Sequence, residues 1–248
     1  DLAHGVDLTD ISLEVRAGEV LGIAGIAGNG QIELMGALSG ETGSPMAGSI
    51  RILGTDAIGL NPAARRSLGA VFVPEERIGH AAVADMTLVD NSYLTGDTRM
   101  NFSHRGLIDW PAVTRFTQKV VQNFDVRTTG VDALASSLSG GNLQKFIVGR
   151  EILQQPSLLV VSQPTWGVDA GAAAAIHEEI QRLVSAGAAV LMISQDLDEV
   201  FLLSHRIAVI SQGTLSVTTL IDEVSPEDIG LLMGVRHEVQ PKVDHVAA

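Results

Sequence analysis

The sequence predicts an α/β fold built on a parallel sheet. Short, almost wholly apolar runs such as 158–161 and 189–193 are typical of strands that are buried on both faces. Segments with helical spacing stand between these runs, and strands that alternate with helices imply parallel pairing with helices on both faces of the sheet. With 248 residues and 46% hydrophobic content, the chain is long enough to bury a substantial core.

The first third of the chain is rich in expected strands. Alternating or continuous apolar residues predict strands at 11–15, 20–23, 49–53 and 70–73. A helix is expected to follow Gly30, because Ile32, Met35 and Leu38 recur at a spacing of three. Gly40 is expected to end that helix.

Residues 76–137 have a different character, because strand-like runs disappear and segment 110–124 shows helical spacing. We therefore expect a helical insertion there. Beyond it, the expected elements are strands 158–161, 189–193 and 206–210, with helices at 172–185 and 197–203. Residues 1–234 are predicted to form a single domain, and the polar, unpatterned residues 235–248 a C-terminal tail.

The composition argues against several kinds of ligand and structural feature. A net charge of −13 argues against a nucleic-acid ligand, whose phosphates need a basic surface. The absence of cysteine excludes disulfides and thiolate metal sites and suits a reducing cytoplasm. The seven histidines lack the spacing of metal ligands, so no metal site is predicted. No uninterrupted apolar run approaches the 18 or so residues of a membrane span.

A glycine-rich segment joins the expected strand 20–23 to the helix that follows. Such a loop presents backbone N–H groups to an anion, and the general phosphate-binding pattern is G-x-x-x-x-G-K-[ST]. The candidate nucleotide-binding residues are Gly25, Gly28, Asn29, Gly30, Gln31, Ile32 and, from a later strand end, Ser162.

Only the glycines of this segment fit the pattern. Gln31 replaces the lysine that would bond the phosphates, and Ile32 replaces the hydroxyl that would bind Mg²⁺; an apolar side chain cannot ligate a hard cation. Two alternatives stay open. The glycines would only allow tight packing of strand on helix, or they would form a dinucleotide-binding loop, whose G-x-G-x-x-G spacing they do not reproduce.

A second glycine-rich segment opens a helix and is followed by a buried strand. Its candidate anion-binding residues are Ser139, Gly140, Gly141, Asn142 and Gln144. The buried strand 158–161 then ends at Ser162 and Gln163, which are polar and uncharged. Glu75 and Gln195 also follow expected strands, with an exposed turn and a helix-capping region as the plain alternatives. Asp169 precedes an alanine-rich helix, and an N-terminal cap of that helix is its plain alternative.

Taken in order, these segments resemble the nucleotide-binding domain of ABC transporters over roughly residues 5–234. The match is closest to the second ATPase half of tandem importers of simple sugars and nucleosides. Segment 24–34 is similar to the Walker A of that half, 139–144 to the signature loop, and 158–163 to the Walker B strand. Glu75 stands in the Q-loop at the usual glutamine, and Gln195 in the H-loop at the usual histidine.

The resemblance implies an ABC-type fold with a parallel-sheet core, an antiparallel β subdomain and a helical subdomain. In that family two domains meet head to tail, and each nucleotide lies between the Walker A of one and the signature loop of the other. Asp169 falls in the D-loop that follows the Walker B strand, where Trp166 departs from the usual arginine. The catalytic base is replaced by Gln163, and loss of a general base alone costs about 10²–10⁴ in rate.

The resemblance therefore implies a site that is catalytically inactive, with no catalytic residue of its own, and ATP binding there that is weak or absent. ATP and Mg²⁺ would belong to the partner's site, which Ser139, Gly140 and Gly141 would complete. The implied partners are the first ATPase half of the same protein, a transmembrane permease and, indirectly, a solute-binding protein, but no nucleic acid. The implied location is peripheral, on the cytoplasmic face of the membrane.

Two rival functions remain. In one, the chain hydrolyses ATP through an unusual carboxylate, Glu75 or Glu76; in the other, it is an ABC protein without a role in transport, such as a translation or repair factor. A further expectation concerns the start of the chain. The family usually carries an aromatic residue before Walker A, whereas the first aromatic here is Phe72, so we expect a piece of a longer polypeptide.

Overall fold

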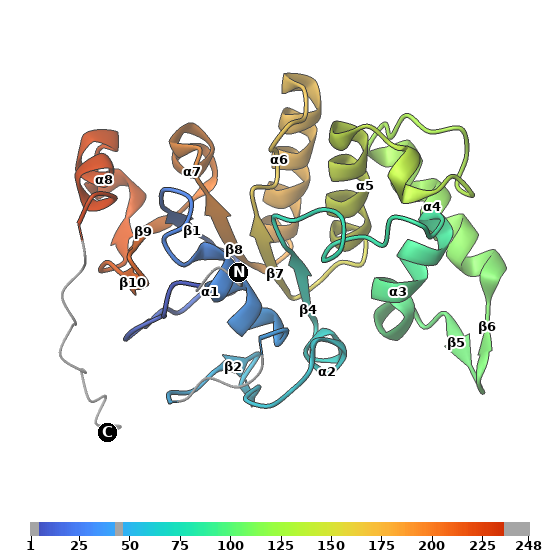
Figure 1. Cartoon of the computed structure of the whole chain (residues 1–248), viewed down its shortest axis with the longest axis horizontal. Helices are drawn as coiled ribbons and strands as arrows, with labels where there is room; N and C mark the ends of the chain where they lie inside the picture. Colours follow the sequence, from blue (N-terminus) through green and yellow to red (C-terminus); the bar gives the residue numbers. More distant parts are fainter. Residues whose placement is uncertain (1–4, 43–46, 236–248) are drawn as a thin grey trace.

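A seven-stranded sheet forms the centre of the molecule in the computed structural model, which describes residues 5–42 and 47–235 (Figure 1). Its strands follow the order β10 (Thr214–Leu215), β9 (Arg206–Ser211), β1 (Val20–Ala24), β8 (Ala189–Ser194), β7 (Leu158–Ser162) and β4 (Ala70–Val73), with β11 (Thr219–Leu220) also paired to β9. The pairs among β9, β1, β8, β7 and β4 are parallel. The predicted parallel-sheet α/β fold is confirmed.

The helices cover both faces of this sheet and extend to one side of it (Figure 1). They are α1 (Gln31–Ser39), α2 (Pro62–Ser67), α3 (Leu88–Met100), α4 (Trp110–Asn123), α5 (Gly140–Ile152), α6 (Ala170–Ser185), α7 (Leu197–Leu203) and α8 (Pro226–Leu232). Short 3₁₀ turns lie at Ala135–Ser137 and Ile221–Glu223. The expected end of α1 at Gly40 is confirmed, because Gly40 caps the helix with a left-handed φ of 86°.

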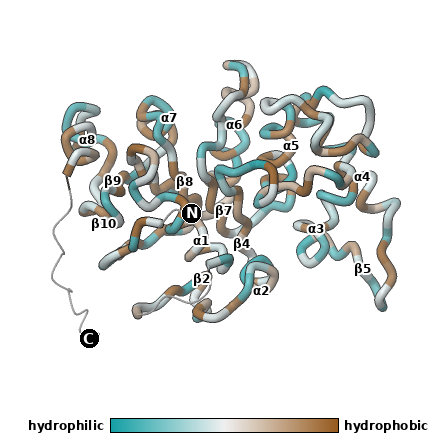
Figure 2. The backbone as a smooth tube through the Cα atoms, viewed as in Figure 1, coloured by the Kyte–Doolittle hydropathy of each residue, from teal (hydrophilic) through white to brown (hydrophobic). Residues whose placement is uncertain are grey.

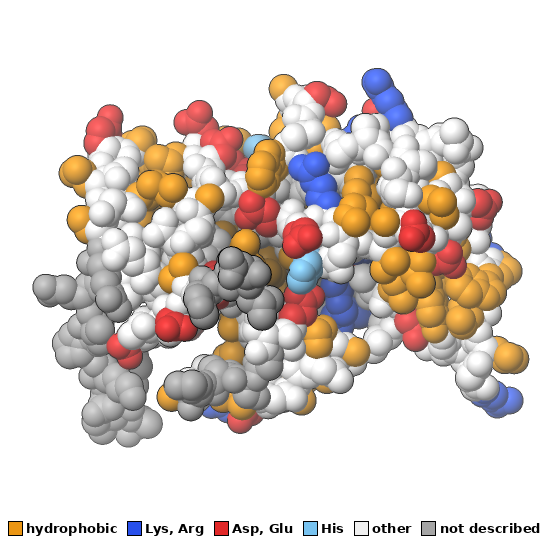
Figure 3. Space-filling model, viewed as in Figure 1, with side chains coloured by type: hydrophobic (Ala, Val, Ile, Leu, Met, Phe, Trp, Pro, Cys, Tyr) orange, Lys and Arg blue, Asp and Glu red, His pale blue; other side chains and the backbone are white. Residues whose placement is uncertain are grey.

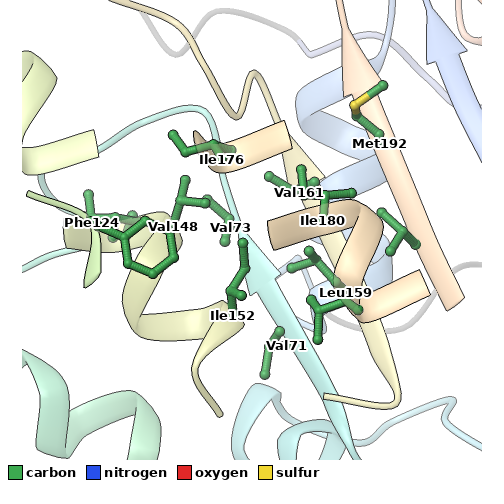
Figure 4. Close-up of a cluster of buried hydrophobic side chains, with 14 of the residues drawn as sticks. Val71, Val73, Phe124, Val148, Ile152, Leu159, Val161, Ile176, Ile180 and Met192 are labelled. Atoms are coloured by element: carbon green, nitrogen blue, oxygen red, sulfur yellow. The ribbon is translucent and has the colours of Figure 1, made fainter. Parts of the chain in front are cut away.

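Side chains of successive strand residues enter two separate hydrophobic clusters. In β7, Leu159 and Val161 belong to the cluster under α5 and α6, whereas Val160 belongs to the cluster on the opposite face, which includes Leu34 of α1. The strands are coloured largely as hydrophobic (Figure 2) because both faces are covered. Figure 4 shows Leu159 and Val161 beside Ile180 of α6 in the first cluster.

Segment 76–137 contains α3 and α4, which pack against each other beside the sheet (Figure 1). Thr87 and Asp90 form a capping box that starts α3. The ring of Phe102, in the connection between the two helices, lies 5.6 Å from the ring of Phe116 and joins that connection to α4. This connection holds a small hairpin, β5 (Ser103–His104) with β6 (Leu107–Ile108), which helical periodicity did not predict.

Two expected strands differ from the structure. Residues 11–15 form no strand: their alternation is real, since Ile11 is half-buried against the core and Ser12 is exposed, but the backbone has no ladder partner among the described residues. The strand expected at 49–53 is reduced to β2 (Arg51–Ile52), which pairs with β3 (Thr55–Asp56) in a hairpin. In the described part of the chain, this hairpin is what remains of the antiparallel β subdomain. The expected tail lies outside the described residues beyond Val235.

Candidate functional site

The candidate residues meet at one edge of the sheet. Ala24 at the end of β1 is paired with Ser194 at the end of β8, and Ser162 at the end of β7 is paired with Ile193. Because the strands are parallel, the segments that leave their carboxyl ends emerge side by side. The loop 25–30 therefore emerges at the same edge as Gln163 and Gln195, which the sequence placed in separate motifs.

Loop 25–30 turns tightly from β1 into α1. Gly28 and Gly30 have φ values of 81° and 112°, in the left-handed region that favours glycine. Gly25 has a different reason to lack a side chain, because a Cβ there would lie 2.7 Å from the carbonyl oxygen of Ile210. The alternative in which the glycines allow tight packing therefore accounts for Gly25, whereas the turn itself requires Gly28 and Gly30.

The Gln31 side chain occupies the inside of this loop. It is 5% exposed; its Nε2 donates to the carbonyl of Ile26 at 2.8 Å, and its Oε1 accepts from the N–H of Asn29 at 3.0 Å. An N–H group that an anion would need is thus already paired within the loop. The residue expected to replace a phosphate-binding lysine serves here as a brace.

Further contacts fix the loop from outside. The Asn29 side chain donates to the Ile26 carbonyl at 2.8 Å and accepts from the N–H of Gln212 at 2.9 Å, so it joins the loop to the turn after β9. Glu33 in the first turn of α1 accepts from the N–H of Val6 at 2.9 Å. Ile32, at the hydroxyl position, is 70% exposed and offers no ligand atom.

The ends of β7 and β8 carry uncharged polar groups. Ser162 is buried at 3% exposed, and Gln163 adopts a left-handed φ of 51° while its N–H donates to the carbonyl of Ile193 at 2.8 Å. The Gln163 Oε1 accepts from the N–H of Gln195 at 3.5 Å. Mg²⁺ is usually bound through carboxylates together with substrate phosphates, and neither Ser162 nor Gln163 supplies one. With Gln31 and Ile32 at the loop, these residues do not fit a magnesium–triphosphate complex.

Glu75 follows β4 after Pro74 and is half-buried. Its burial raises the pKa of the carboxyl group above the ordinary value of 4.5. Gln195 is exposed at the end of β8. Within the described residues, no group of three His, Asp or Glu side chains is arranged to hold a metal ion.

The glycine-rich segment before α5 is exposed at its tip. Ser139 and Gly140 face solvent, and Ser139 is the N-cap residue of α5 although its side chain makes no capping bond. Its Oγ accepts from Nδ2 of Asn142 at 2.9 Å, and Oδ1 of Asn142 accepts from the N–H of Arg127 at 2.9 Å. The helix therefore begins with open N–H groups at an anchored loop, which is a favourable environment for an anion.

Gln144 lies behind this loop and is 3% exposed. Its Nε2 donates to the carbonyls of Gln163 and Pro164, each at 3.0 Å. Gln144 thus ties α5 to the end of β7, and it is turned away from solvent. Asp169 starts α6, with Oδ1 accepting from the N–H of Ala172 at 3.0 Å, and this hydrogen bond holds the pKa of Asp169 below its ordinary value. The capping alternative for Asp169 is confirmed.

A buried carboxylate that the sequence did not single out lies at the same edge. Glu199 is 4% exposed and accepts from Oγ of Ser194 at 2.8 Å and from Oγ1 of Thr165 at 2.6 Å, and its Oε1 lies 3.0 Å from Nε2 of His177. Glu199 borders a cavity of about 490 Å³ that Gln163 also lines. No spacing rule predicts this cluster, because its members come from four separate segments.

Arg77, in the loop after β4, is a second residue that the sequence did not single out. Its Nε donates to Oε1 of Gln144 at 2.9 Å, and its Nη2 donates to the carbonyl of Trp166. Among the described residues, no hydrogen bond joins loop 25–30 to segment 139–144, so the two glycine-rich segments of one chain remain separate.

Residues 8–166 match the sequence model of the ABC transporter family, and they include loop 25–30, the segment before α5 and the β7 strand end. The chain belongs to the ABC transporter family. The ABC chain is 40% identical over 223 residues to the nucleoside import ATP-binding protein NupA of Lactococcus lactis subsp. cremoris, covering 90% of this chain and 44% of NupA. It is 38% identical over 228 residues to the glucose import ATP-binding protein TsgD13 of Haloferax volcanii, covering 91% and 41%.

The ABC chain thus spans less than half the length of these relatives. Its fold is similar to that of an ATP-binding cassette solved as a dimer in a post-hydrolysis state with ADP and Pi. The TM-score is 0.73 at 19% identity, over 86% of this chain and 90% of that one. In the described part of the ABC chain, no helix is both long enough and apolar enough to cross a membrane.

Proposed function

We propose that this ABC chain is the degenerate second ATPase half of an importer of nucleosides or simple sugars. It does not hydrolyse ATP at its own phosphate loop, and it completes the site of a partner domain through Ser139, Gly140 and Gly141. The similarity to import ATP-binding proteins for a nucleoside and for glucose supports the importer assignment.

The contrast between the two glycine-rich segments carries the proposal. At loop 25–30, the Gln31 amide already pairs with Asn29, and Ile32 offers no oxygen. Phosphoryl transfer depends on positioning and on charge neutralisation by metal and cationic groups, which this loop lacks. At the start of α5, in contrast, Ser139 and Gly140 are exposed with open backbone donors. The start of α5 thus retains groups that can bind a nucleotide phosphate, whereas loop 25–30 lacks them.

The partners follow from this division of roles. The partner domain is the first ATPase half, which supplies its own Walker A, ATP and Mg²⁺ opposite Ser139. A transmembrane permease docks on the region from Glu75 through α3 and α4, and a solute-binding protein acts through that permease. The chain works at the cytoplasmic face of the membrane. A nucleotide bound in its own pocket would have a structural or regulatory role.

The purified chain tests the first half of the proposal. With ATP and Mg²⁺ it should release no phosphate above background, and calorimetric titration of ATP should give the same weak or absent binding with and without Mg²⁺. Robust turnover by the pure chain contradicts the proposal. In the intact importer, Ser139→Ala should reduce ATP hydrolysis, because the partner's site loses a ligand.

Hydrolysis at this chain's own pocket through Glu75 is a second candidate. One observation favours this second candidate. Burial raises the pKa of Glu75, and raised carboxyl pKa values are common at catalytic sites. In that case Glu75→Gln abolishes turnover at this pocket. Under our proposal, Glu75→Gln changes the coupling between ATP hydrolysis and transport instead.

A nucleic-acid-associated role is disfavoured by charge. The net charge is −13, and acidic and basic side chains are scattered over the face of the molecule in Figure 3 without a continuous basic area. Co-purification of the chain with a permease, and not with RNA, would separate the two roles.

A further inference from the structure

Arg77 lies where three functional segments meet. It belongs to the loop after β4, it is half-buried, and its Nε donates to Oε1 of Gln144 in the first turns of α5 at 2.9 Å. Its Nη2 donates to the carbonyl of Trp166 in the segment between β7 and α6. One guanidinium thus joins the loop after β4, the helix that begins at Gly140, and the D-loop segment 162–169.

Gln144 completes this junction from the other side. Both of its amide hydrogens are used, because Nε2 donates to the carbonyls of Gln163 and Pro164 at 3.0 Å each. Its Oε1 accepts from Arg77. Gln144 is only 3% exposed, so loss of Arg77 would leave its Oε1 without a donor in a buried position.

The glycines around the Arg77 guanidinium lie so close to it that a side chain on them would crowd it. A Cβ on Gly140 would lie 2.8 Å from Nη1 of Arg77, and a Cβ on Gly167 would lie 3.1 Å from Nη2. A Cβ on Gly141 would lie 2.8 Å from the carbonyl oxygen of Gly167. Segment 139–141 and the D-loop therefore touch each other and share Arg77 as their common neighbour.

The chemistry of the junction requires an arginine. Its planar fork directs several N–H groups to different acceptors at once, whereas a lysine supplies one point charge on a flexible stem. Burial lowers the pKa of Arg77 below its ordinary value, as expected for a cation whose acceptors are a carbonyl and an amide. Its hydrogen-bond partners, the Gln144 amide oxygen and the Trp166 carbonyl, are neutral, so Arg77 fixes geometry and does not form an ion pair with them.

We propose that Arg77 is a positioning residue that fixes Ser139–Gly141 relative to the D-loop and links both to the loop after β4. The inference rests on the proposed function, in which Ser139–Gly141 complete the ATP site of a partner domain. Movement of the loop after β4, on the surface assigned to the permease, would then reach that site through a single side chain.

Loss of Arg77 should affect the reaction more than ATP binding. The partner's own Walker A holds the nucleotide, so its KM for ATP should remain within about twofold. The donated loop acts only when the two domains close, and misplacement of a positioning group by about 1 Å costs about 10² in rate. We therefore expect kcat of Arg77→Ala to fall by about 10- to 100-fold.

The experiment uses the intact importer in proteoliposomes, with ATP hydrolysis measured over a range of ATP concentrations. Arg206→Ala is the matched control, because Arg206 is also half-buried and donates to a backbone carbonyl, that of Glu14, at 3.3 Å, but it lies on β9, away from the junction and from the region assigned to the permease. Arg77→Lys keeps the charge and the length of the side chain. Arg77→Lys should retain only part of the ATPase activity. If Arg77→Ala does not fold, the kcat of Arg77→Lys tests the positioning role in its place.

Two outcomes overturn the inference. One is a kcat of both Arg77 variants equal to that of Arg206→Ala, and the other is a rise in KM at unchanged kcat. Ser139→Ala separates the inference from the proposed function. If Ser139→Ala leaves hydrolysis unchanged, the proposed function fails; if it lowers kcat while the Arg77 variants do not, only the role of Arg77 fails.

Fluorescence of the chain alone supplies a readout independent of ATP. Trp166 is 57% exposed, and its carbonyl accepts from Arg77. In a Trp110→Phe background Trp166 is the sole tryptophan, since the sequence has two. Arg77→Ala should lower the emission anisotropy of Trp166, and Arg206→Ala should not. Equal anisotropy in all three chains contradicts a role of Arg77 in holding the D-loop.

Discussion

The side-chain amide of Gln31 donates to the carbonyl oxygen of Ile26 at 2.8 Å, across the inside of the glycine-rich loop. The same amide accepts from the N–H of Asn29, so donor and acceptor are both satisfied within the loop. A lysine at this position would leave that N–H open and add a positive charge. The loop thus retains its backbone shape while its interior is filled by its own chain.

Gln31→Ala should destabilise the chain by about 1–3 kcal/mol, because the N–H of Asn29 loses its partner while the Ile26 carbonyl still accepts from the Asn29 side chain. Urea unfolding at equilibrium measures the change in the free energy of unfolding. Ile32→Ala is the neighbouring control: Ile32 is 70% exposed, so its change should stay within about 0.5 kcal/mol. Equal stability of the two variants would show that the Gln31 brace is unimportant.

The buried ion cluster between α2 and α5 predicts a dependence of stability on pH. Glu151 is fully buried and accepts from Arg66 Nη1 at 2.7 Å and from Arg150 Nε at 2.9 Å. Burial by itself raises the pKa of Glu151, but the two guanidinium groups outweigh it and hold the pKa below the ordinary 4.5. A depressed pKa stabilises the fold above about 4.5, and this stabilisation is lost as pH falls below that value.

Glu151→Gln should therefore cost about 3–5 kcal/mol at neutral pH, because it leaves the buried Arg150 without its counter-charge. Below pH 4.5 the variant should lose stability less steeply than the parent chain. Urea unfolding at a series of pH values measures both effects. The exposed Glu178→Gln serves as control, and parallel curves for all three chains would disprove the assignment.

Replacement of Glu199, which lies outside the recognised motifs, should lower the stability of the fold by a large amount. Glu199→Ala removes the acceptor of Thr165 and Ser194 and the neighbour of His177, all in a buried position. We expect a loss of about 2–4 kcal/mol in the free energy of unfolding, since hydrogen bonds to a buried charged group are each worth about 1.5–3 kcal/mol and are not additive.

Asp198→Ala is the matched control for this change, because Asp198 is the preceding residue on the same short helix and is exposed. Thermal unfolding of the two variants in parallel distinguishes the buried network from a general loss of acidic charge. A loss of stability in Asp198→Ala as large as that in Glu199→Ala would count against the network.

The sheet was predictable because its strands carry continuous apolar runs, as in β7 and β8, and such runs have few alternatives in a chain of this length. Segment 11–15 shows the limit of that approach. Alternation reports which side chains face the core, and it does not report whether the backbone finds a partner strand. The hairpin at 103–108 was not predicted, because strands of two residues are too short to show a periodic pattern of apolar residues.

The candidate site also has features that the sequence could predict and features that it could not. The glycine-rich turns and the cap at Asp169 depend on local chemistry, so a few neighbouring residues were enough to predict them. The cluster around Glu199 and the junction at Arg77 depend on which segments the sheet brings together. A spacing rule cannot find them, because their partners lie up to 89 residues apart in the sequence.

Gly149 in α5 tests how closely the first hydrophobic cluster is packed. A Cβ at this position would lie 2.5 Å from the ring of Phe124, which is itself 4% exposed and is labelled beside Val148 in Figure 4. Overpacking costs about 1–3 kcal/mol, whereas alanine in place of a helical glycine gains about 0.5–1 kcal/mol. Gly149→Ala should therefore reduce the free energy of unfolding in spite of the better helix former.

Gly230 in α8 supplies the opposite case, because among the described residues no atom outside the backbone of its own helix lies within 4 Å of a Cβ built there. Gly230→Ala should raise the free energy of unfolding by about 0.5–1 kcal/mol, the helical gain alone. Phe124→Leu combined with Gly149→Ala completes the test. If the ring causes the cost, the smaller side chain makes room for the new methyl group, and the two changes together cost less than their sum. Strict additivity would mean that Gly149 is required for some reason other than contact with Phe124.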